Sequence, residues 1–321
     1  MKSQIGAALI VALVAVACVA APAPSTQPDP PSPTTNVPTT TAPPTTMPAT
    51  TPPTSEAATA RSRPATPLAT DRTEVAVVDD LVAEVFYPID EGDYPTVVFF
   101  HGGSWYGGDS MTTREFARTL AGQGAVVYNA TYLNGQSGGG YPHSYQDVYC
   151  AMSTAAATSP GLGGSSEVIV VGHSAGAHLG ATVAMSGDAF ASGRCLDRAT
   201  PTVVGLVGLA GPYDTFELGV FMAPWFGGAP ADVPEAWELG NPQSYVETPL
   251  FPVTLIHGSG DRLVRLDSSQ LFADLLASAG WVAEVYVIPA ATHNGILDPI
   301  GDGREAAAKI AEFARSLQQP E

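Results

Sequence analysis

The segment with the clearest chemical meaning is the pentapeptide GHSAG at 172–176, in which a serine lies between two glycines. It follows an apolar, β-branched run over 167–171 and precedes a stretch with helical periodicity over 175–186. A serine at a sharp turn from a strand into a helix is presented for chemistry, and the turn needs small neighbours, which glycine supplies. We therefore predict that Ser174 is a nucleophile.

A second glycine-rich segment, HGGSW at 101–105, directly follows another apolar run. The backbone N–H groups of a loop without bulky side chains can point at the negative charge that develops on a carbonyl oxygen during acyl transfer. We expect the N–H groups of Gly103 and Ser104 to form such an oxyanion hole, with Ala175 as the third donor.

A nucleophilic serine needs a base, and six histidines compete for that role. Only His293 lies in a loop after the last predicted strand, from where it can reach back to Ser174, so we predict that it is the base. The other five lie in strand-end turns, in the GHSAG turn, in the helix after it or just before the preceding helix: His101, His143, His173, His178 and His257.

The base in turn needs a carboxylate that orients it and stabilises its protonated form. Asp261 follows the predicted strand over 252–257 in a loop position suited to hold His293. Of the competitors, Asp267 is expected to cap a helix and Asp298 to be a solvated loop charge before a proline. We therefore predict Asp261 as the acid.

Strands and helices must alternate to bring these distant loops together. The two central strand runs, 97–100 and 168–171, are apolar throughout, as strands covered by helices on both faces are. The alternation predicts an α/β fold with a mostly parallel sheet. The expected strands are 74–78, 81–87, 96–100, 125–130, 167–171, 203–209, 252–257 and 282–288, and the expected helices are 112–121, 144–158, 175–186, 267–279 and 304–317.

With these segments in place, the chain from about residue 71 onward resembles the α/β-hydrolase superfamily. The resemblance is to its esterase branch, with hormone-sensitive-lipase-like and feruloyl-esterase-like carboxylesterases and kynurenine formamidases. It implies the α/β-hydrolase fold: an eight-stranded, mostly parallel sheet with helices on both faces and a small cap after strand 6. Ser104 stands where hormone-sensitive-lipase-like members usually carry a third glycine, which favours the other two groups. The matching segments are HGGSW at 101–105, GHSAGAHL at 172–179, HGSGDRLV at 257–264 and THN at 292–294.

The stretch over 215–250 is too long for a simple connection and too apolar for a solvated one. Its aromatic residues lie among glycines and prolines, which indicates a small cap over the site. We expect Trp225 from this stretch to form a substrate pocket with Trp105 and Tyr106.

Residues 1–21 have the composition of an export signal, with Lys2 ahead of an unbroken apolar run over 5–16. Cys18 lies in a sequence that resembles a lipobox, so we expect either lipidation of Cys18 or cleavage to a freely secreted protein. An uncleaved anchor is a third alternative. Residues 22–70 contain 14 Pro and 14 Thr among 49 residues and are predicted to be a disordered linker. Residues 71–321 are predicted to be the catalytic domain.

The formal net charge of −18 repels both phosphate backbones and anionic headgroups, which argues against a nucleic-acid partner. In an exported protein, the two cysteines after Cys18, Cys150 and Cys195, are expected to form a disulfide, with two buried thiols as the alternative. No residue spacing is typical of structural zinc, and the expected chemistry needs no metal or cofactor.

These features predict an exported or lipid-anchored serine hydrolase that cleaves small-molecule carboxylic esters through an acyl-enzyme intermediate. Any membrane contact is expected through the N-terminus alone, and the sequence does not define the oligomeric state. An aryl formamidase with the same triad is one alternative. A hydrolase-fold binding module without catalytic activity is the other, from a different functional class.

Overall fold

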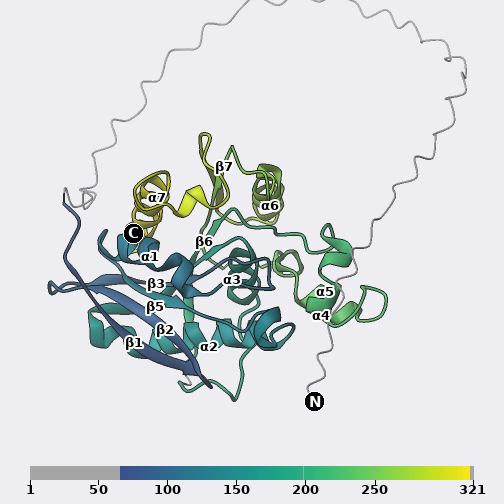
Figure 1. The fold of residues 1–321 in the computed structure, drawn as a ribbon, viewed down its shortest axis with the longest axis horizontal. Helices are drawn as coiled ribbons and strands as arrows, with labels where there is room; N and C mark the ends of the chain where they lie inside the picture. Colours follow the sequence, from purple (N-terminus) through teal and green to yellow (C-terminus); the bar gives the residue numbers. More distant parts are fainter. Residues whose placement is uncertain (1–65, 198, 249, 319–321) are drawn as a thin grey trace, which may run out of the picture. The chain divides into compact units, whose positions relative to one another are not determined.

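One mixed sheet organises the described part of the chain, which in this computed structural model comprises residues 66–197, 199–248 and 250–318. Eight strands follow the order β1-β2-β4-β3-β5-β6-β7-β8 (Figure 1). The β1–β2 and β2–β4 pairs are antiparallel and every other pair is parallel. The predicted mostly parallel, eight-stranded sheet is therefore confirmed. The strands are β1 Thr70–Val78, β2 Leu81–Pro88, β3 Tyr94–Phe100, β4 Val126–Ala130, β5 Gly164–His173, β6 Thr202–Leu209, β7 Val253–Gly258 and β8 Ala283–Ile288.

The central strands are buried on both faces, which explains their uninterrupted apolar sequences. Every residue of β3 after Tyr94 is buried. Val98 and Phe100 pack into one hydrophobic core, whereas Val97 and Phe99 pack into a second. Because successive side chains of a strand point to opposite faces, both faces require a helical cover.

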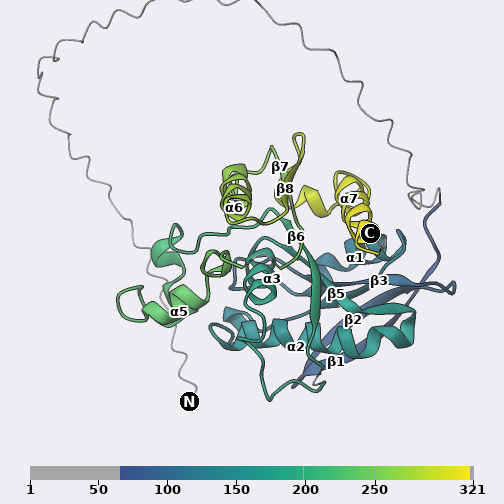
Figure 2. The ribbon, with the colours of Figure 1, turned by 180° about the vertical axis from the view of Figure 1, so that it is seen from behind.

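The longer helices divide between the two faces of the sheet. Side chains of α2, α3 and α6 pack into the first core, and side chains of α1 and α7 pack into the second. Figures 1 and 2 show α1 and α7 side by side at the end of the molecule that holds the C-terminus. The helices are α1 Arg114–Ala121, α2 His143–Thr158, α3 Ala175–Met185, α4 Ala223–Phe226, α5 Pro234–Leu239, α6 Leu266–Ser278 and α7 Gly303–Ser316. Short 3₁₀ turns are η1 Ser110–Thr113, η2 Gly135–Ser137, η3 Ser159–Leu162, η4 Gly219–Phe221, η5 Pro242–Tyr245 and η6 Gly295–Leu297.

Several strand limits differ from the predicted ones. β1 begins at Thr70, which was expected to end the linker, because Thr70 already pairs with Pro88 of β2. β5 begins at Gly164, three residues before the predicted start, because Gly164 pairs with Tyr94 of β3. These extensions follow from pairing with a neighbouring strand, which local sequence does not reveal.

The predictions for the N-terminal region concern residues outside the described part of the chain. These are the export signal over 1–21, the lipidation candidate Cys18 and the linker up to residue 65. Among the described residues, no helix combines the length and apolar character needed to cross a membrane.

The cap predicted after the sixth strand consists of short helical turns, η4, α4, α5 and η5. Trp237 of α5 is fully buried there, with its ring 4.7 Å from that of Phe226 and its indole N–H donating to the carbonyl oxygen of Gly228 at 2.9 Å. The aromatic residues of this stretch therefore serve partly as the core of the cap itself.

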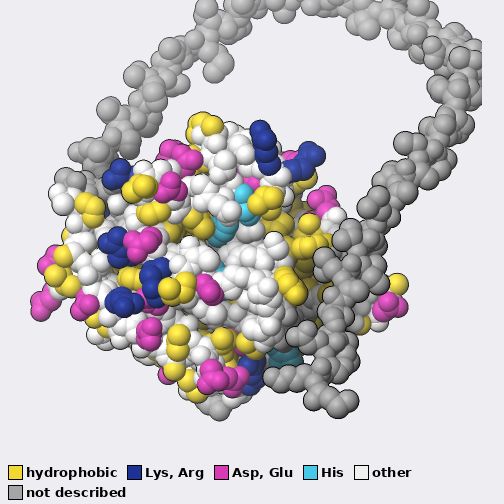
Figure 3. Space-filling model, viewed as in Figure 1, with side chains coloured by type: hydrophobic (Ala, Val, Ile, Leu, Met, Phe, Trp, Pro, Cys, Tyr) yellow, Lys and Arg dark blue, Asp and Glu magenta, His cyan; other side chains and the backbone are white. Residues whose placement is uncertain are grey.

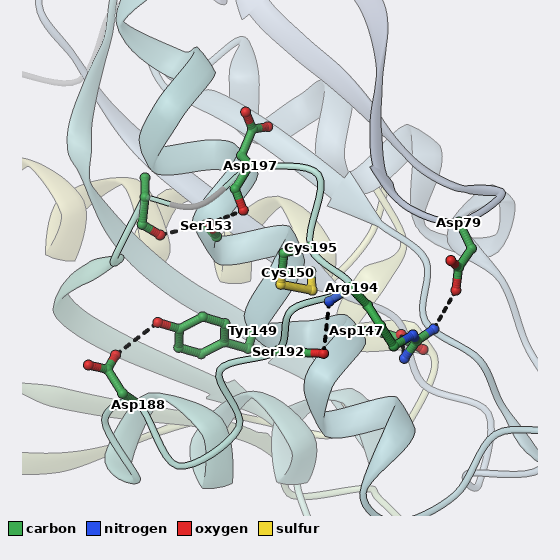
Figure 4. Close-up of a disulfide and its surroundings, with 11 residues drawn as sticks. Asp79, Asp147, Tyr149, Cys150, Ser153, Asp188, Ser192, Arg194, Cys195 and Asp197 are labelled. Carbon is green, nitrogen blue, oxygen red and sulfur yellow. Dashed lines mark hydrogen bonds and ion pairs between the residues drawn. A yellow bond between two sulfur atoms is a disulfide. The ribbon is translucent and has the colours of Figure 1, made fainter.

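Cys150 of α2 and Cys195, in the loop after α3, form a disulfide (Figure 4). Arg194, beside Cys195, pairs with Asp147 of α2 at 3.2 Å and with Asp79 of the β1–β2 turn at 2.6 Å. Because Asp147 is fully buried, its charge needs partners, which are Arg194 and the backbone N–H of Leu133 at 3.1 Å. The disulfide and the ion pairs together fasten this loop to α2 and to the edge of the sheet.

Candidate active site

Ser174 occupies a strained turn between β5 and α3. Its φ of 53° and ψ of −121° lie where residues with a side chain are rarely found. Its backbone N–H donates to the carbonyl oxygen of Leu209 at 2.8 Å. At Gly176, a Cβ would lie 2.3 Å from the carbonyl oxygens of Phe100 and His101, so α3 can approach β3 only with glycine there. The neighbouring strands thus hold the turn that presents Ser174.

His293 lies in the loop between β8 and η6, only 8% exposed. Its Nδ1 is 2.7 Å from Oδ2 of Asp261. Because a carboxylate can only accept, Nδ1 carries the proton and Nε2 of the neutral ring is free to accept another. His293 and Ser174 line the same cavity of about 590 Å³. In the view of Figure 3, histidine side chains, in cyan, reach the molecular surface beside hydrophobic side chains, in yellow.

Asp261 is a fully buried carboxylate that receives several hydrogen bonds. Oδ1 accepts the backbone N–H groups of Leu263 at 2.8 Å and Val264 at 3.0 Å. Burial opposes the charged form, but these donors and His293 outweigh it and lower the pKa of Asp261 below its ordinary value. A carboxylate that is ionised near pH 7 therefore faces Nδ1 of His293. Nε2 of His257 lies 3.3 Å from the same Oδ2.

Other histidines near the site are buried and have lowered pKa values. Burial and the neighbouring His293 lower the pKa of His173 to about 3. Nε2 of His173 donates to the carbonyl oxygen of His293 at 2.9 Å, which helps to hold the loop of His293. Burial also lowers the pKa values of His101 and His257. These neighbours are held neutral and engaged in structural contacts.

The loop after β3 presents backbone N–H groups beside Ser174. Gly103 has a φ of 143°, and a Cβ there would lie 1.9 Å from the carbonyl oxygen of Gly107. Within the residues that the structure describes, the N–H groups of Gly103 and Ser104 donate no hydrogen bond to the protein. The N–H of Ala175 is the first of α3 and has no acceptor within the helix. All three candidate donors thus lie at or beside the cavity of Ser174.

A second, more apolar cavity of about 500 Å³ adjoins the first at Ser104. It brings together the three predicted pocket residues, Trp105, Tyr106 and Trp225, with Phe221 of the cap. Trp105 is only 5% exposed, whereas Tyr106 is 65% exposed. Trp105 is therefore a buried part of the cavity lining and Tyr106 an exposed part.

Some residues of the site were not assigned from the sequence. Leu263 and Asn294 line the cavity of Ser174, and both fall inside segments that the sequence analysis singled out. The expected helix cap was wrong: α6 begins at Leu266, and Asp267 lies inside its first turn. Arg265 explains this difference, because its guanidinium binds the Asp267 carboxylate.

A family model named BD-FAE matches residues 84–276, which is more than half of the chain. The chain belongs to the BD-FAE family. The matched range contains GHSAG, the glycine-rich loop and Asp261, whereas His293 lies beyond it. The predicted resemblance to α/β-hydrolase carboxylesterases is thereby confirmed.

Two plant proteins are similar to this BD-FAE member. The isoprenylcysteine alpha-carbonyl methylesterase ICME of Arabidopsis thaliana is 24% identical over 234 residues, covering 67% of this chain and 54% of the relative. A probable isoprenylcysteine alpha-carbonyl methylesterase ICME of Oryza sativa subsp. japonica is 26% identical over 230 residues, covering 66% and 55%. The chain spans about half the length of these curated relatives.

Solved structures share the fold of this BD-FAE member. Butyrate-bound esterase 2 of Thermogutta terrifontis has a TM-score of 0.65 at 20% identity, covering 78% of this chain and 94% of that one. An inhibited esterase B of Lactobacillus rhamnosis has a TM-score of 0.66 at 19% identity, covering 77% and 87%. At this level of identity the likeness shows the α/β-hydrolase fold.

Proposed function

We propose that this protein hydrolyses carboxylic esters, with Ser174 as nucleophile, His293 as general base and acid, and Asp261 as the orienting carboxylate. One observation carries the proposal: His293, buried and hydrogen-bonded to Asp261, lines the same cavity as a serine held in a strained strand-to-helix turn. The names of the plant relatives, which are methylesterases, support the reaction class.

In the first half of the proposed reaction, Oγ of Ser174 attacks the ester carbonyl carbon while its proton passes to Nε2 of His293. The imidazolium then gives this proton to the oxygen of the leaving alcohol as the carbon–oxygen bond breaks. The acyl group remains on Ser174. The ionised Asp261 stabilises the imidazolium, which is consistent with the lowered pKa of this carboxyl.

In the second half, His293 takes a proton from water, and the hydroxide attacks the acyl-enzyme. The proton returns to Oγ of Ser174 as the carboxylic acid leaves. In both halves the N–H groups of Gly103, Ser104 and Ala175 stabilise the tetrahedral oxyanion. These donors are available for that role because they lie beside Ser174 and have no acceptor among the residues that the structure describes.

The two adjoining cavities suggest how the substrate lies. The leaving alcohol must be next to His293, which protonates it, so we assign the alcohol to the cavity lined by His293, Asn294 and Leu263. The acyl group then extends past Ser104 into the apolar cavity formed with Trp105, Tyr106 and Trp225. This assignment predicts that substitutions in the second cavity change acyl-chain preference.

We further propose that the protein is exported and held at the cell surface or released, on the basis of its N-terminal sequence. Export places Cys150 and Cys195 in an oxidising environment, which suits their disulfide. Metabolic labelling with a palmitate analogue, compared between the parent and Cys18→Ala, tests lipidation. Label on the parent alone supports a lipid anchor, and no label on either supports free secretion.

A substrate panel tests the proposed reaction class. Short-chain and long-chain p-nitrophenyl esters, a feruloyl ester and N-formylkynurenine are compared on the full chain and on Ser174→Ala. We expect turnover of one or more esters that disappears in the variant while its circular dichroism is retained. Faster turnover of N-formylkynurenine than of any ester would favour the aryl formamidase instead. No turnover and no fluorophosphonate labelling would favour a binding module.

A further inference from the structure

A buried histidine outside the proposed triad contacts the loop that carries the oxyanion donors. We propose that His178, on the first turns of α3, is a positioning residue that fixes this loop by accepting the indole N–H of Trp105. The inference rests on the proposed function, because it concerns how Gly103 and Ser104 are held in place for the oxyanion. His178 is fully buried and does not line the cavity of Ser174.

The hydrogen bonds of His178 define which ring nitrogen carries its proton. Nε1 of Trp105 donates to Nδ1 of His178 at 3.0 Å. Because indole can only donate, Nδ1 must be unprotonated. Nε2 of His178 therefore carries the proton, which it donates to the carbonyl oxygen of Gly240 at 2.8 Å. Both ring nitrogens of His178 have a hydrogen-bond partner, and these two bonds fix the orientation and the tautomer of the ring.

The loop that Trp105 anchors has a backbone that needs such support. Three consecutive residues, Gly103, Ser104 and Trp105, have φ values of 143°, 53° and 59°. A residue with a side chain persists at positive φ only where its surroundings hold it. The loop also has backbone bonds to Gly103, Gly135 and Gln136, and the side chains of His101 and Asn134 bond the carbonyl oxygens of Gly102 and Gly108. Among the described residues, His178 is the side chain that hydrogen-bonds Trp105 itself. Without it, Ser104 and Trp105 can relax and move the N–H groups away from the oxyanion.

His178 also connects this loop to the cap. The carbonyl oxygen of Gly240, at the end of α5, accepts a second hydrogen bond from the hydroxyl of Tyr145 at 3.1 Å. Tyr145 in turn accepts the indole N–H of Trp225 at 3.3 Å. The two tryptophans that line the apolar cavity are thus held by one buried network, centred on His178 and Tyr145.

The His178 ring must be neutral to accept the hydrogen bond of Trp105, and its burial keeps it so. Burial lowers the pKa of His178 to about 4, so the ring is neutral near pH 7 and Nδ1 stays an acceptor. A protonated ring would present a donor to the donor of Trp105. Trp105 and Tyr145 both pack edge-on to the ring, at centroid distances of 5.4 and 6.0 Å.

Two amide substitutions separate the two hydrogen bonds of His178. In His178→Asn the side-chain oxygen can reach the position of Nδ1, which keeps the acceptor for Trp105. In His178→Gln the side-chain nitrogen can reach the position of Nε2, which keeps the bond to Gly240 and loses that to Trp105. Trp105→Phe removes the indole N–H that donates to Nδ1 of His178. His143→Asn and His143→Gln, at an exposed histidine, are the matched controls.

The test measures kcat, KM and the affinity for a trifluoromethyl ketone, which forms an oxyanion on the serine, together with melting temperature. We expect His178→Gln and Trp105→Phe each to lower kcat about 10- to 100-fold and to weaken ketone binding in parallel, since misplacement of the donors acts on the transition state. KM should stay within about threefold in His178→Gln, because His178 lines neither cavity. His178→Asn should lose less than about fivefold in kcat. The double variant His178→Gln/Trp105→Phe should be no worse than the singles.

The proposal is overturned if folded His178→Gln and Trp105→Phe keep kcat within threefold of the parent. It is also overturned if His178→Asn and His178→Gln lose kcat equally, because the acceptor would then not matter. If either variant unfolds, the remaining one decides by the same criteria. Failure of the proposed function would give a different result: Ser174→Ala would keep its ester turnover, whatever the His178 variants do.

Discussion

Oδ2 of Asp261 lies 2.7 Å from Nδ1 of His293, and the Asp261 side chain is fully buried. The distance is that of a charge-assisted hydrogen bond. Because two backbone N–H groups hold the other oxygen of Asp261, the carboxylate has little freedom to turn away. The pair therefore holds His293, which lines the cavity of Ser174, in the tautomer whose Nε2 can accept a proton.

Asp261→Asn should leave the shape of this pair intact and remove its charge. The amide can donate to Nδ1 and so favour the wrong tautomer of His293, and it cannot stabilise the imidazolium. We expect kcat to fall by on the order of 10³–10⁴. Asp267→Asn is the control, since this aspartate pairs with Arg265 at the surface. Equal kcat in Asp261→Asn and the parent would remove Asp261 from the proposed mechanism.

Gly176→Ala should disrupt the turn that presents Ser174. The added Cβ would lie 2.3 Å from two carbonyl oxygens at the end of β3, so α3 must move away. We expect the free energy of unfolding to fall by about 1–3 kcal/mol and ester turnover to drop with it. Gly161→Ala is the control, because a Cβ there meets no atom within 4 Å. Urea denaturation that finds both variants equally stable would contradict this account of the turn.

The local signals of the site were readable in the sequence, because each depends on a few adjacent residues. GHSAG predicted the turn at Ser174. His293 was selected because it follows the last predicted strand, and Asp261 because of its loop position after the strand over 252–257. The contacts of His178 were not predictable. Trp105, His178 and Gly240 belong to three separate segments, and no periodicity relates them. The cap turns were missed for a related reason, since helices as short as α4 have no amphipathic pattern to detect.

The Cys150→Ala/Cys195→Ala variant should be less stable and equally active. The disulfide closes a loop with a sequence separation of 45 residues, so its loss frees the unfolded chain and costs about 2–4 kcal/mol. Neither cysteine lines the cavity of Ser174, so kcat should stay within about twofold. The measurement is urea denaturation with and without reductant. Reductant should lower the stability of the parent and leave that of the variant unchanged; an effect on both would contradict the assignment.

Acid should destabilise the folded protein in part through His178. Burial lowers its pKa from 6.5 to about 4, so between these values the unfolded chain binds a proton that the folded chain does not. Stability therefore falls as pH falls through this window, by about 1.4 kcal/mol per pH unit for this group and roughly 3 kcal/mol in all. His173 and Asp261, whose pKa values are also lowered, act in the same direction.

The His178→Asn variant isolates this contribution, because asparagine does not titrate. Its free energy of unfolding, measured in urea from pH 7 to pH 4.5, should depend less steeply on pH than that of the parent. His143→Asn, at an exposed position, should keep the parental slope. Identical slopes in the parent and in His178→Asn would contradict a buried, neutral histidine at this position.

Covalent labelling tests the central claim most directly. The full chain is treated with a fluorophosphonate, and the modified residue is located by peptide mass spectrometry while residual ester turnover is followed. We predict one label per chain, on Ser174, with turnover lost in proportion to labelling, and no label on Ser174→Ala. A label on another residue that accompanies the loss of turnover, or full turnover in a protein labelled at Ser174, would contradict the account.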